Sequence, residues 1–218
     1  MDLKGLKINF LGDSITEGHG SSSSEFNYVN VLKRNACLAE ARNYGIGGTK
    51  ITRKHTIDPN NRMDIDFNMR VDKMDDDADI IVVFGGTNDF GTPMPLGRSE
   101  DRDVYTFYGA LHTLILSLIK KYVGKPIVFL TPLHRLNEDA MQTLNPEGMK
   151  RNPLIDYVKA IREVCEIYSI PVLDMYKDSG MNGNIWAYCE KYMPDGLHPN
   201  DKGYAQIANK LQKFLENL

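Results

Sequence analysis

Apolar residues along this chain fall into short continuous runs separated by longer segments with helical spacing. The run at 80–84, Ile-Ile-Val-Val-Phe, is apolar throughout, which is typical of a strand buried on both faces of a sheet. Runs at 6–11, 126–130 and 170–173 predict three more strands, and a shorter candidate lies at 41–44. The pattern therefore predicts four strands and a candidate fifth.

Segments with the period of an amphipathic helix fill the gaps at 105–122, 153–168 and 201–218. Strands that alternate with helices in this way pair in parallel through crossover connections. The predicted fold class is therefore α/β, a three-layer α/β/α sandwich. The sequence contains no internal repeat and no linker, so we expect one domain over residues 1–218.

Glycine-rich polar segments follow three of these strands, at 12–14, 45–48 and 85–89. In open parallel sheets, ligands bind outside the carboxyl ends of the strands. We therefore expect the chemistry of this protein to lie at that edge of the sheet.

The first of these segments reads Gly12-Asp13-Ser14-Ile15-Thr16. A serine between a buried strand and a helix can project its hydroxyl over the sheet edge, with its N–H at a helix N-terminus that favours a developing oxyanion. Two alternatives remain at this point: a helix cap, or a phosphate cradle of the kind that flavodoxin-like proteins build after their first strand.

The second and third segments offer hydrogen-bond donors. The turn at 43–48 has three glycines in four residues, which lets a backbone N–H approach a ligand closely or simply makes a tight turn. In Gly85-Gly86-Thr87-Asn88-Asp89, the Asn88 amide can donate to an oxyanion. It can equally bond its own backbone in an Asx turn.

A fourth segment, Pro194-Asp195-Gly196-Leu197-His198-Pro199, leads into the C-terminal helical pattern. The prolines exclude a regular helix interior, and Gly196 relaxes the backbone between the two polar residues. A histidine three residues beyond an aspartate can turn its ring onto the carboxylate, which then holds the tautomer. A surface contact without function is the alternative, and two ligands make a poor metal site.

Together these segments supply a nucleophile, a base, an orienting carboxylate and oxyanion donors. Gly12-Asp13-Ser14-Ile15 resembles the signature of the GDSL, or SGNH, hydrolase superfamily, with Ile in place of Leu. The four segments occur in the order of the family's blocks and extend over nearly the whole chain. The resemblance implies a flavodoxin-like sheet of five parallel strands and hydrolysis of esters or thioesters without a metal or other cofactor.

By position, the resemblance implies that Ser14 is the nucleophile, His198 the general base and then acid, and Asp195 its partner. It implies three oxyanion donors, namely the N–H of Ser14, the N–H of Gly48 and the Asn88 amide. The GxSxG elbow of α/β-hydrolases is absent, which disfavours that fold.

Two details of that assignment depend on spacing and charge. Gly47 competes with Gly48 for the second backbone donor, and the spacing from Asn43 favours Gly48. Asp13 and Asp89 are expected to fix the two loops, because a carboxylate pointing inward would oppose an oxyanion.

Composition and charge narrow the classes of ligand and the cellular location that we expect for this protein. The net charge is −3 and basic residues do not cluster, so we expect no nucleic acid ligand. The three cysteines form no CxxC pair, which fits a reducing compartment, and no apolar stretch is long enough to span a membrane. Residues 1–7 lack the apolar core of a signal peptide, so we expect a cytoplasmic protein or a mature secreted form without its leader.

We therefore predict a serine esterase for short acyl groups on small molecules or carbohydrates, with O-acetyl carbohydrates as the working choice. The alternatives are an acyltransferase or thioesterase with the same site, and a non-catalytic phosphate- or flavin-binding module. His134, Arg135 and Trp186 are predicted substrate contacts, because His134 and Arg135 follow a strand and Trp186 lies with other aromatics in a predicted cleft-side loop at 176–194.

Overall fold

The computed structural model describes residues 1–139 and 152–218 and contains one five-stranded sheet in the order β2-β1-β3-β4-β5. Every neighbouring pair of strands is parallel. The strands are β1 (Lys7–Gly12), β2 (Glu40–Gly45), β3 (Ile80–Phe84), β4 (Ile127–Leu130) and β5 (Val172–Leu173). The predicted three-layer α/β fold with a flavodoxin-like parallel sheet is confirmed.

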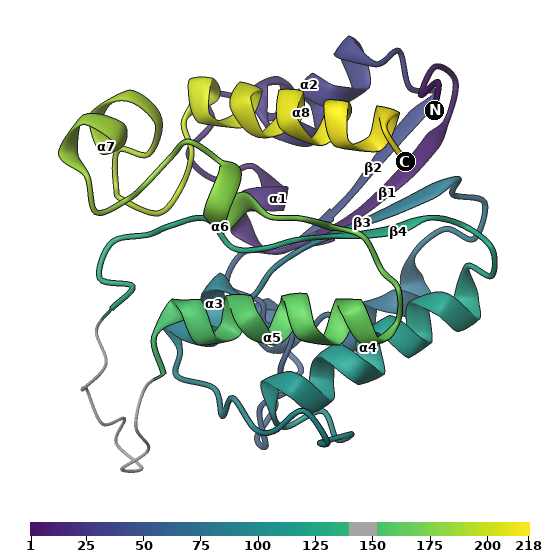
Figure 1. Cartoon of the computed structure of the whole chain (residues 1–218), viewed down its shortest axis with the longest axis vertical. Coiled ribbons are helices and arrows are strands. Elements are labelled where there is room, and N and C mark those ends of the chain that lie inside the picture. The colour runs from purple at the N-terminus through teal and green to yellow at the C-terminus, as the bar shows by residue number, and fades with distance from the viewer. Residues whose placement is uncertain (140–151) are drawn as a thin grey trace.

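The helices cover both faces of this sheet (Figure 1). In chain order they are α1 (Ser14–Glu17), α2 (Tyr28–Asn35), α3 (Thr87–Gly91), α4 (Phe107–Lys121), α5 (Leu154–Ile167), α6 (Met175–Asp178), α7 (Trp186–Tyr192) and α8 (Asp201–Glu216). Helices α2 and α8 pack together on one face, and α4 and α5 pack together on the other. Within the described ranges, none of the helices is long and apolar enough to cross a membrane.

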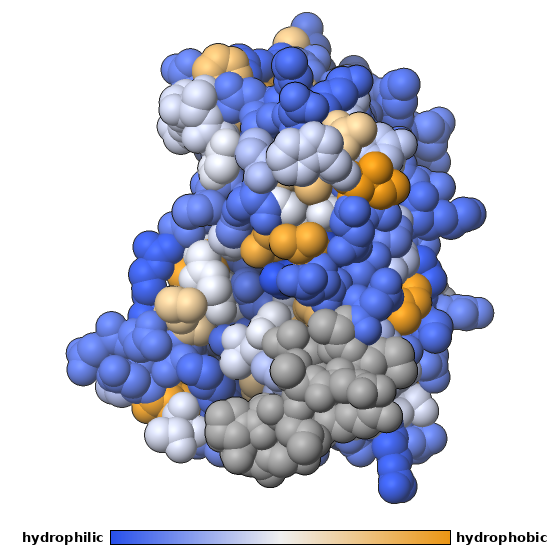
Figure 2. Space-filling model, turned by 90° about the vertical axis from the view of Figure 1, so that its left-hand side faces the viewer, coloured by the Kyte–Doolittle hydropathy of each residue, from blue (hydrophilic) through white to orange (hydrophobic). Residues whose placement is uncertain are grey.

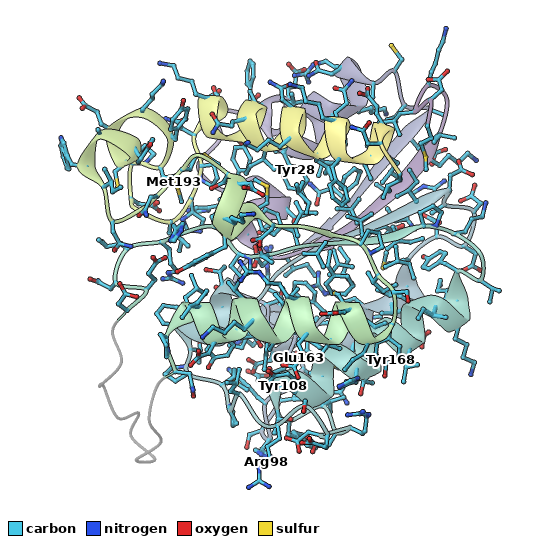
Figure 3. All side chains as sticks on the ribbon, viewed as in Figure 1. Tyr28, Arg98, Tyr108, Glu163, Tyr168 and Met193 are labelled. Atoms are coloured by element: carbon cyan, nitrogen blue, oxygen red, sulfur yellow. The ribbon has the colours of Figure 1, made fainter. Side chains whose placement is uncertain are left out.

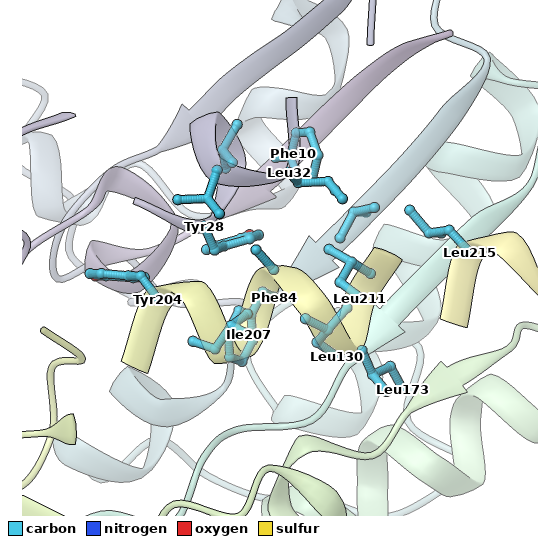
Figure 4. Packing of buried hydrophobic residues seen from close by; sticks show 14 of the residues in the cluster. Phe10, Tyr28, Leu32, Phe84, Leu130, Leu173, Tyr204, Ile207, Leu211 and Leu215 are labelled. Atoms are coloured by element: carbon cyan, nitrogen blue, oxygen red, sulfur yellow. The ribbon is translucent and has the colours of Figure 1, made fainter. Parts of the chain in front are cut away.

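The core under α2 and α8 is built by the apolar faces of these helices and of the strands. Tyr28, Tyr204 and Phe10 are fully buried, and Figure 4 shows them packed with leucines of α8 and with Phe84 of β3. Burial of each large apolar side chain stabilises the fold by about 1.5–3 kcal/mol. This layer therefore fixes α8, and with it the loop that precedes α8, against β1.

The opposite core lies between the sheet and the α4–α5 pair. Leu111, Leu114 and Leu118 of α4 are fully buried, as the helical spacing predicts. At the outer side of the pair, the Tyr108 hydroxyl donates to Glu163 at 2.7 Å (Figure 3). This bond joins α4 to α5.

The connectivity of the sheet places the glycine-rich segments beside one another. The chain leaves β1, forms β2 on one side of it, and returns to form β3 on the other side. The crevice of such a sheet lies outside the point where the strand order reverses, here between β1 and β3. The segments that follow β1, β2 and β3 all reach this edge.

Two details differ from the sequence predictions, and one predicted segment lies mostly outside the described residues. The segment 176–194, predicted to be a loop, contains α6 and α7. The predicted strand at 170–173 is shortened to two residues, because Pro171 has no N–H for the ladder, although its carbonyl accepts the Phe129 N–H at 3.1 Å. The sequence also predicts a cleft-side loop at 132–152, and most of that segment lies outside the described residues.

Candidate active site

The turn after β1, residues 12–18, is called the nucleophile turn below. Glycine is required at position 12 because a Cβ there would lie 1.9 Å from Thr16 Oγ1, which packs over it. Asp13 caps α1 by accepting the Ile15 N–H at 3.0 Å, and Thr16 shares a 2.9 Å hydrogen bond with the buried Tyr28 hydroxyl. These contacts hold Ser14 at the first position of α1, with 9% of its surface exposed.

The loop before α8, residues 194–200, is called the base loop. Its geometry centres on Asp195, whose Oδ1 accepts the backbone N–H of Leu197 at 2.9 Å and of His198 at 2.7 Å. Gly196 adopts a φ of 74°, the left-handed conformation that lets the chain wrap around the carboxylate. Asn200 then caps α8 through its side-chain oxygen.

Ser14, His198 and Asp195 form one hydrogen-bonded series. His198 Nδ1 lies 2.6 Å from Asp195 Oδ2, and His198 Nε2 lies 3.1 Å from Ser14 Oγ. The carboxylate stabilises a proton on Nδ1, which leaves Nε2 able to accept the serine proton. The structure thus brings together three predicted residues that are up to 184 positions apart.

The Asp195 carboxylate is half-exposed and suited to remain ionised. Partial burial acts to raise its pKa, but the hydrogen bonds from the His198 ring and from the two backbone N–H groups outweigh burial and lower the pKa below its usual value. A permanently charged carboxylate at this position stabilises an imidazolium on His198.

The turn after β2, residues 43–49, is called the glycine loop. Gly48 has a φ of 76°, a left-handed conformation that favours glycine, and the Met63 side chain lies over it, 2.3 Å from the position of a Cβ there. Gly47 donates its N–H to Glu17 Oε2 at 2.7 Å. The Gly48 N–H has no hydrogen-bond partner among residues 1–139 and 152–218. The geometry therefore favours Gly48 over Gly47 as a donor to a ligand.

The glycine loop is beside the serine and is linked to α3. A Cβ on Gly47 would lie 3.6 Å from Ser14 Cβ. Asn88, at the start of α3, donates one amide hydrogen to the Thr49 carbonyl at 3.0 Å. An amide carries two hydrogens, so this bond orients the group and leaves the second hydrogen for a ligand.

Two buried carboxyl groups brace these turns. Asp89 is fully buried and accepts the backbone N–H groups of Ile51 at 3.1 Å and Thr52 at 2.9 Å. Asp13 is 2% exposed, and burial raises its pKa to about 7, against the opposing effects of the Ile15 N–H and Arg70. Both carboxyl groups bond to backbone, as expected from their structural assignment.

The three residues predicted to contact the substrate lie in local environments of their own. His134 Nδ1 lies 2.6 Å from Glu138 and its ring packs on Tyr176 with centroids 3.7 Å apart. Arg135 donates to the carbonyl of Thr87, the residue before Asn88, at 3.1 Å. Trp186 is 79% exposed at the start of α7. Substrate contact by these three residues stays a prediction.

Two residues outside the predicted set of site residues touch the site. The His19 ring packs against the His198 ring with centroids 4.3 Å apart, and the Tyr204 hydroxyl holds the His19 carbonyl at 2.6 Å. Glu17 reaches the glycine loop from α1. The only available signal was their proximity to Ser14, because both contacts depend on how distant segments fold together.

The face of the molecule drawn in Figure 2, which is the left-hand side of Figure 1, is mainly hydrophilic. Figure 2 shows small, separate apolar groups there rather than one continuous apolar face, outside the area covered by the grey residues. A long acyl chain needs a continuous apolar surface, whereas a small polar ester does not.

The chain is similar to known lipases and acylhydrolases. Residues 10–206 match the GDSL-like lipase/acylhydrolase family. A solved protein from Lactobacillus plantarum is 33% identical, with 98% of each chain covered and a TM-score of 0.84. No curated protein matches the chain.

More distant structures share the fold. The lipase/acylhydrolase from Enterococcus faecalis is 23% identical with a TM-score of 0.66, and 97% of this chain and 96% of that one are covered. A two-domain esterase active on acetylated mannans is 19% identical with a TM-score of 0.60, and the match covers 98% of this chain but 49% of that one.

Proposed function

Because this chain belongs to the GDSL-like lipase/acylhydrolase family, we propose that it is a serine esterase that hydrolyses short acyl esters. The observation that supports this activity most directly is the series Ser14–His198–Asp195 at the edge of the sheet. A helix cap or a phosphate cradle would account for polar residues in the nucleophile turn but has no use for a base aligned on Ser14.

The proposed reaction is acyl transfer in two steps. Ser14 Oγ attacks the ester carbonyl carbon as its proton passes to His198 Nε2, and the carbonyl oxygen becomes an oxyanion. The alcohol then leaves with the proton from His198, giving an acyl-serine. Water repeats the sequence, so that the acid is released and Ser14 regains its proton.

The oxyanion is assigned to three donors, the N–H of Ser14, the N–H of Gly48 and the free hydrogen of the Asn88 amide. Both backbone donors lack an internal partner within the described residues. An N–H that is left unbonded in the free protein can bind a developing charge without first breaking another bond.

The proposed substrates carry small acyl groups, with O-acetyl carbohydrates as the first class to examine. The hydrophilic surface in Figure 2 supports this choice over long-chain lipids. The fold relative that is active on acetylated mannans makes acetylated glycans a practical second substrate.

We expect Ser14→Ala to abolish hydrolysis of p-nitrophenyl acetate, because no hydroxyl remains to form the acyl-enzyme. The measurement compares wild type, Ser14→Ala and Ser23→Ala, with octanoate and decanoate esters alongside. Ser23 is an exposed serine whose side chain makes no capping bond, so it is the matched control. Equal rates for wild type and Ser14→Ala would refute the serine mechanism.

The same assay distinguishes the related activities. An acetyl thioester tests for a thioesterase, and an added alcohol that captures the acyl group in place of water would reveal an acyltransferase. A rate that falls from acetate to decanoate supports the short-acyl assignment, and a rising rate would contradict it.

A further inference from the structure

Glu17 connects the nucleophile turn to the glycine loop. It is the last residue of α1, three positions after Ser14, and its Oε2 accepts the Gly47 N–H at 2.7 Å. Asn43, at the other end of the glycine loop, donates to the Thr16 carbonyl at 2.6 Å. The loop is therefore tied to α1 at both ends, and only the Glu17 contact is adjacent to Gly48.

The carboxylate also has a partner outside the loop. Glu17 Oε1 forms an ion pair with Arg62, which lies in the short 3₁₀ turn Arg62–Asp64. A Cβ on Gly47 would lie 2.8 Å from Glu17 Oε2 and 3.8 Å from Arg62 Nη2. The neighbouring Met63 covers Gly48. One surface turn thus packs on both glycines and on the carboxylate that binds the first of them.

The Glu17 carboxylate has two opposite effects on an oxyanion formed at this site. As a hydrogen-bond acceptor it fixes the Gly47 peptide, so the next donor, the Gly48 N–H, has a defined direction. As a negative charge it opposes an oxyanion formed nearby. The Arg62 guanidinium offsets that charge without replacing the hydrogen bond to Gly47.

We propose that Glu17 is a positioning residue that holds the Gly47 peptide so that Gly48 donates to the oxyanion, with Arg62 neutralising its charge. This inference rests on the esterase function proposed above. It assigns Glu17 a role through the backbone of the glycine loop and not through contact with the substrate.

Four variants separate the acceptor from the charge, with kcat and KM for p-nitrophenyl acetate as the first readout. Glu17→Ala removes both, and we expect kcat to fall about 10- to 30-fold with KM changed less than about 2-fold, since losing one oxyanion donor entirely costs about 10²–10³. Glu17→Gln keeps an oxygen acceptor for Gly47, so we expect a rate within about 3-fold of wild type.

Arg62→Ala leaves the carboxylate uncompensated. Because the pair is solvent-exposed, we expect only about a 3-fold loss of kcat. In the Glu17→Gln background no charge remains to be offset, so Arg62→Ala should then have no effect. An equal loss in both backgrounds would overturn the charge-neutralising role of Arg62.

A second readout depends on the tetrahedral state alone. An alkyl boronic acid adds to a serine hydroxyl to form a tetrahedral anion, and its Kd can be measured by calorimetry without turnover. We expect Kd to rise about 10-fold in Glu17→Ala and to be restored in Glu17→Gln, with the Tm of both variants close to that of wild type.

The outcomes distinguish the inference from the function on which it rests. An active wild type with Glu17→Ala at the wild-type rate and boronate Kd would overturn the role of Glu17 alone. The same is true if Glu17→Gln loses as much activity as Glu17→Ala. A wild type that neither hydrolyses the ester nor binds the boronic acid would overturn both.

Discussion

Two turns of this protein each place an aspartate beside a catalytic candidate, and the pKa of the aspartate is shifted in opposite directions in the two turns. In the nucleophile turn, Asp13 is buried, and burial raises its pKa to about 7. In the base loop, Asp195 is half-exposed and receives three hydrogen bonds, which lower its pKa despite partial burial. The balance between burial and hydrogen bonding sets the direction of each shift, because full burial dominates at Asp13 and three hydrogen bonds outweigh partial burial at Asp195.

The difference matches two tasks. In the proposed mechanism, an ionised Asp195 stabilises positive charge on His198 during proton transfer. An ionised Asp13 next to Ser14 would oppose the oxyanion, and burial disfavours that ionised form. The same residue type therefore serves charge stabilisation in one turn and backbone capping in the other.

Among the variants that test this comparison of Asp13 with Asp195, we expect Asp195→Asn to have the largest effect. An amide cannot stabilise the imidazolium and favours the wrong tautomer of His198, so we expect kcat to fall about 10³- to 10⁴-fold. Steady-state hydrolysis of p-nitrophenyl acetate measures the loss, and circular dichroism checks the fold. A loss below about 10-fold would show that the carboxylate is dispensable.

Asn88→Ala tests the donors on the other side of the site. Removing the amide should lower kcat by about 10²–10³, because one of three oxyanion donors is lost. The change also removes the hydrogen bond to Thr49, so the Tm is measured in parallel. A nearly normal kcat would exclude Asn88 from the oxyanion site.

Asp13→Asn should have the smallest effect on activity and a distinctive effect on stability. Asp13 has a folded pKa raised above its unfolded value, so the native state binds the extra proton between about pH 4 and pH 7. Its contribution to stability is therefore greatest at low pH and is lost as pH rises through about 7. Asparagine keeps the acceptor for Ile15 and removes this dependence.

The measurement is the Tm of wild type and Asp13→Asn from pH 5 to pH 8, with the exposed Asp178→Asn as a control. We expect the advantage of Asp13→Asn to grow by several degrees over this range, since 1 kcal/mol corresponds to about 2–4 °C for a chain of this size. A constant difference would mean that Asp13 is ionised throughout.

The sequence predicted the components of the site that are contained in local motifs. Asp195 and His198 are three residues apart, and Ser14 lies two residues after the end of β1, so local motifs identified all three as candidates and the family resemblance implied their roles. The limits of α4, α5 and α8 were predicted within two residues at each end, because their apolar periodicity is strong.

What the sequence did not predict depends on tertiary contacts. The β2 pattern is weak because β2 is an edge strand, with one neighbour and few buried side chains. The short α7 follows no clear apolar period. Glu17 and His19 acquire their partners only when Gly47 and His198 are brought to the same edge of the sheet.

The separation of Ser14 from His198 along the chain has a consequence for the order in which the parts of the site are synthesised. Ser14 precedes His198 by 184 residues, so the base loop, held by α8 packed against α2, is synthesised after the nucleophile turn. The nucleophile turn is therefore synthesised well before the base loop. Under the proposed mechanism, a chain translated only as far as α5 has the nucleophile turn without its base and cannot yet turn over esters.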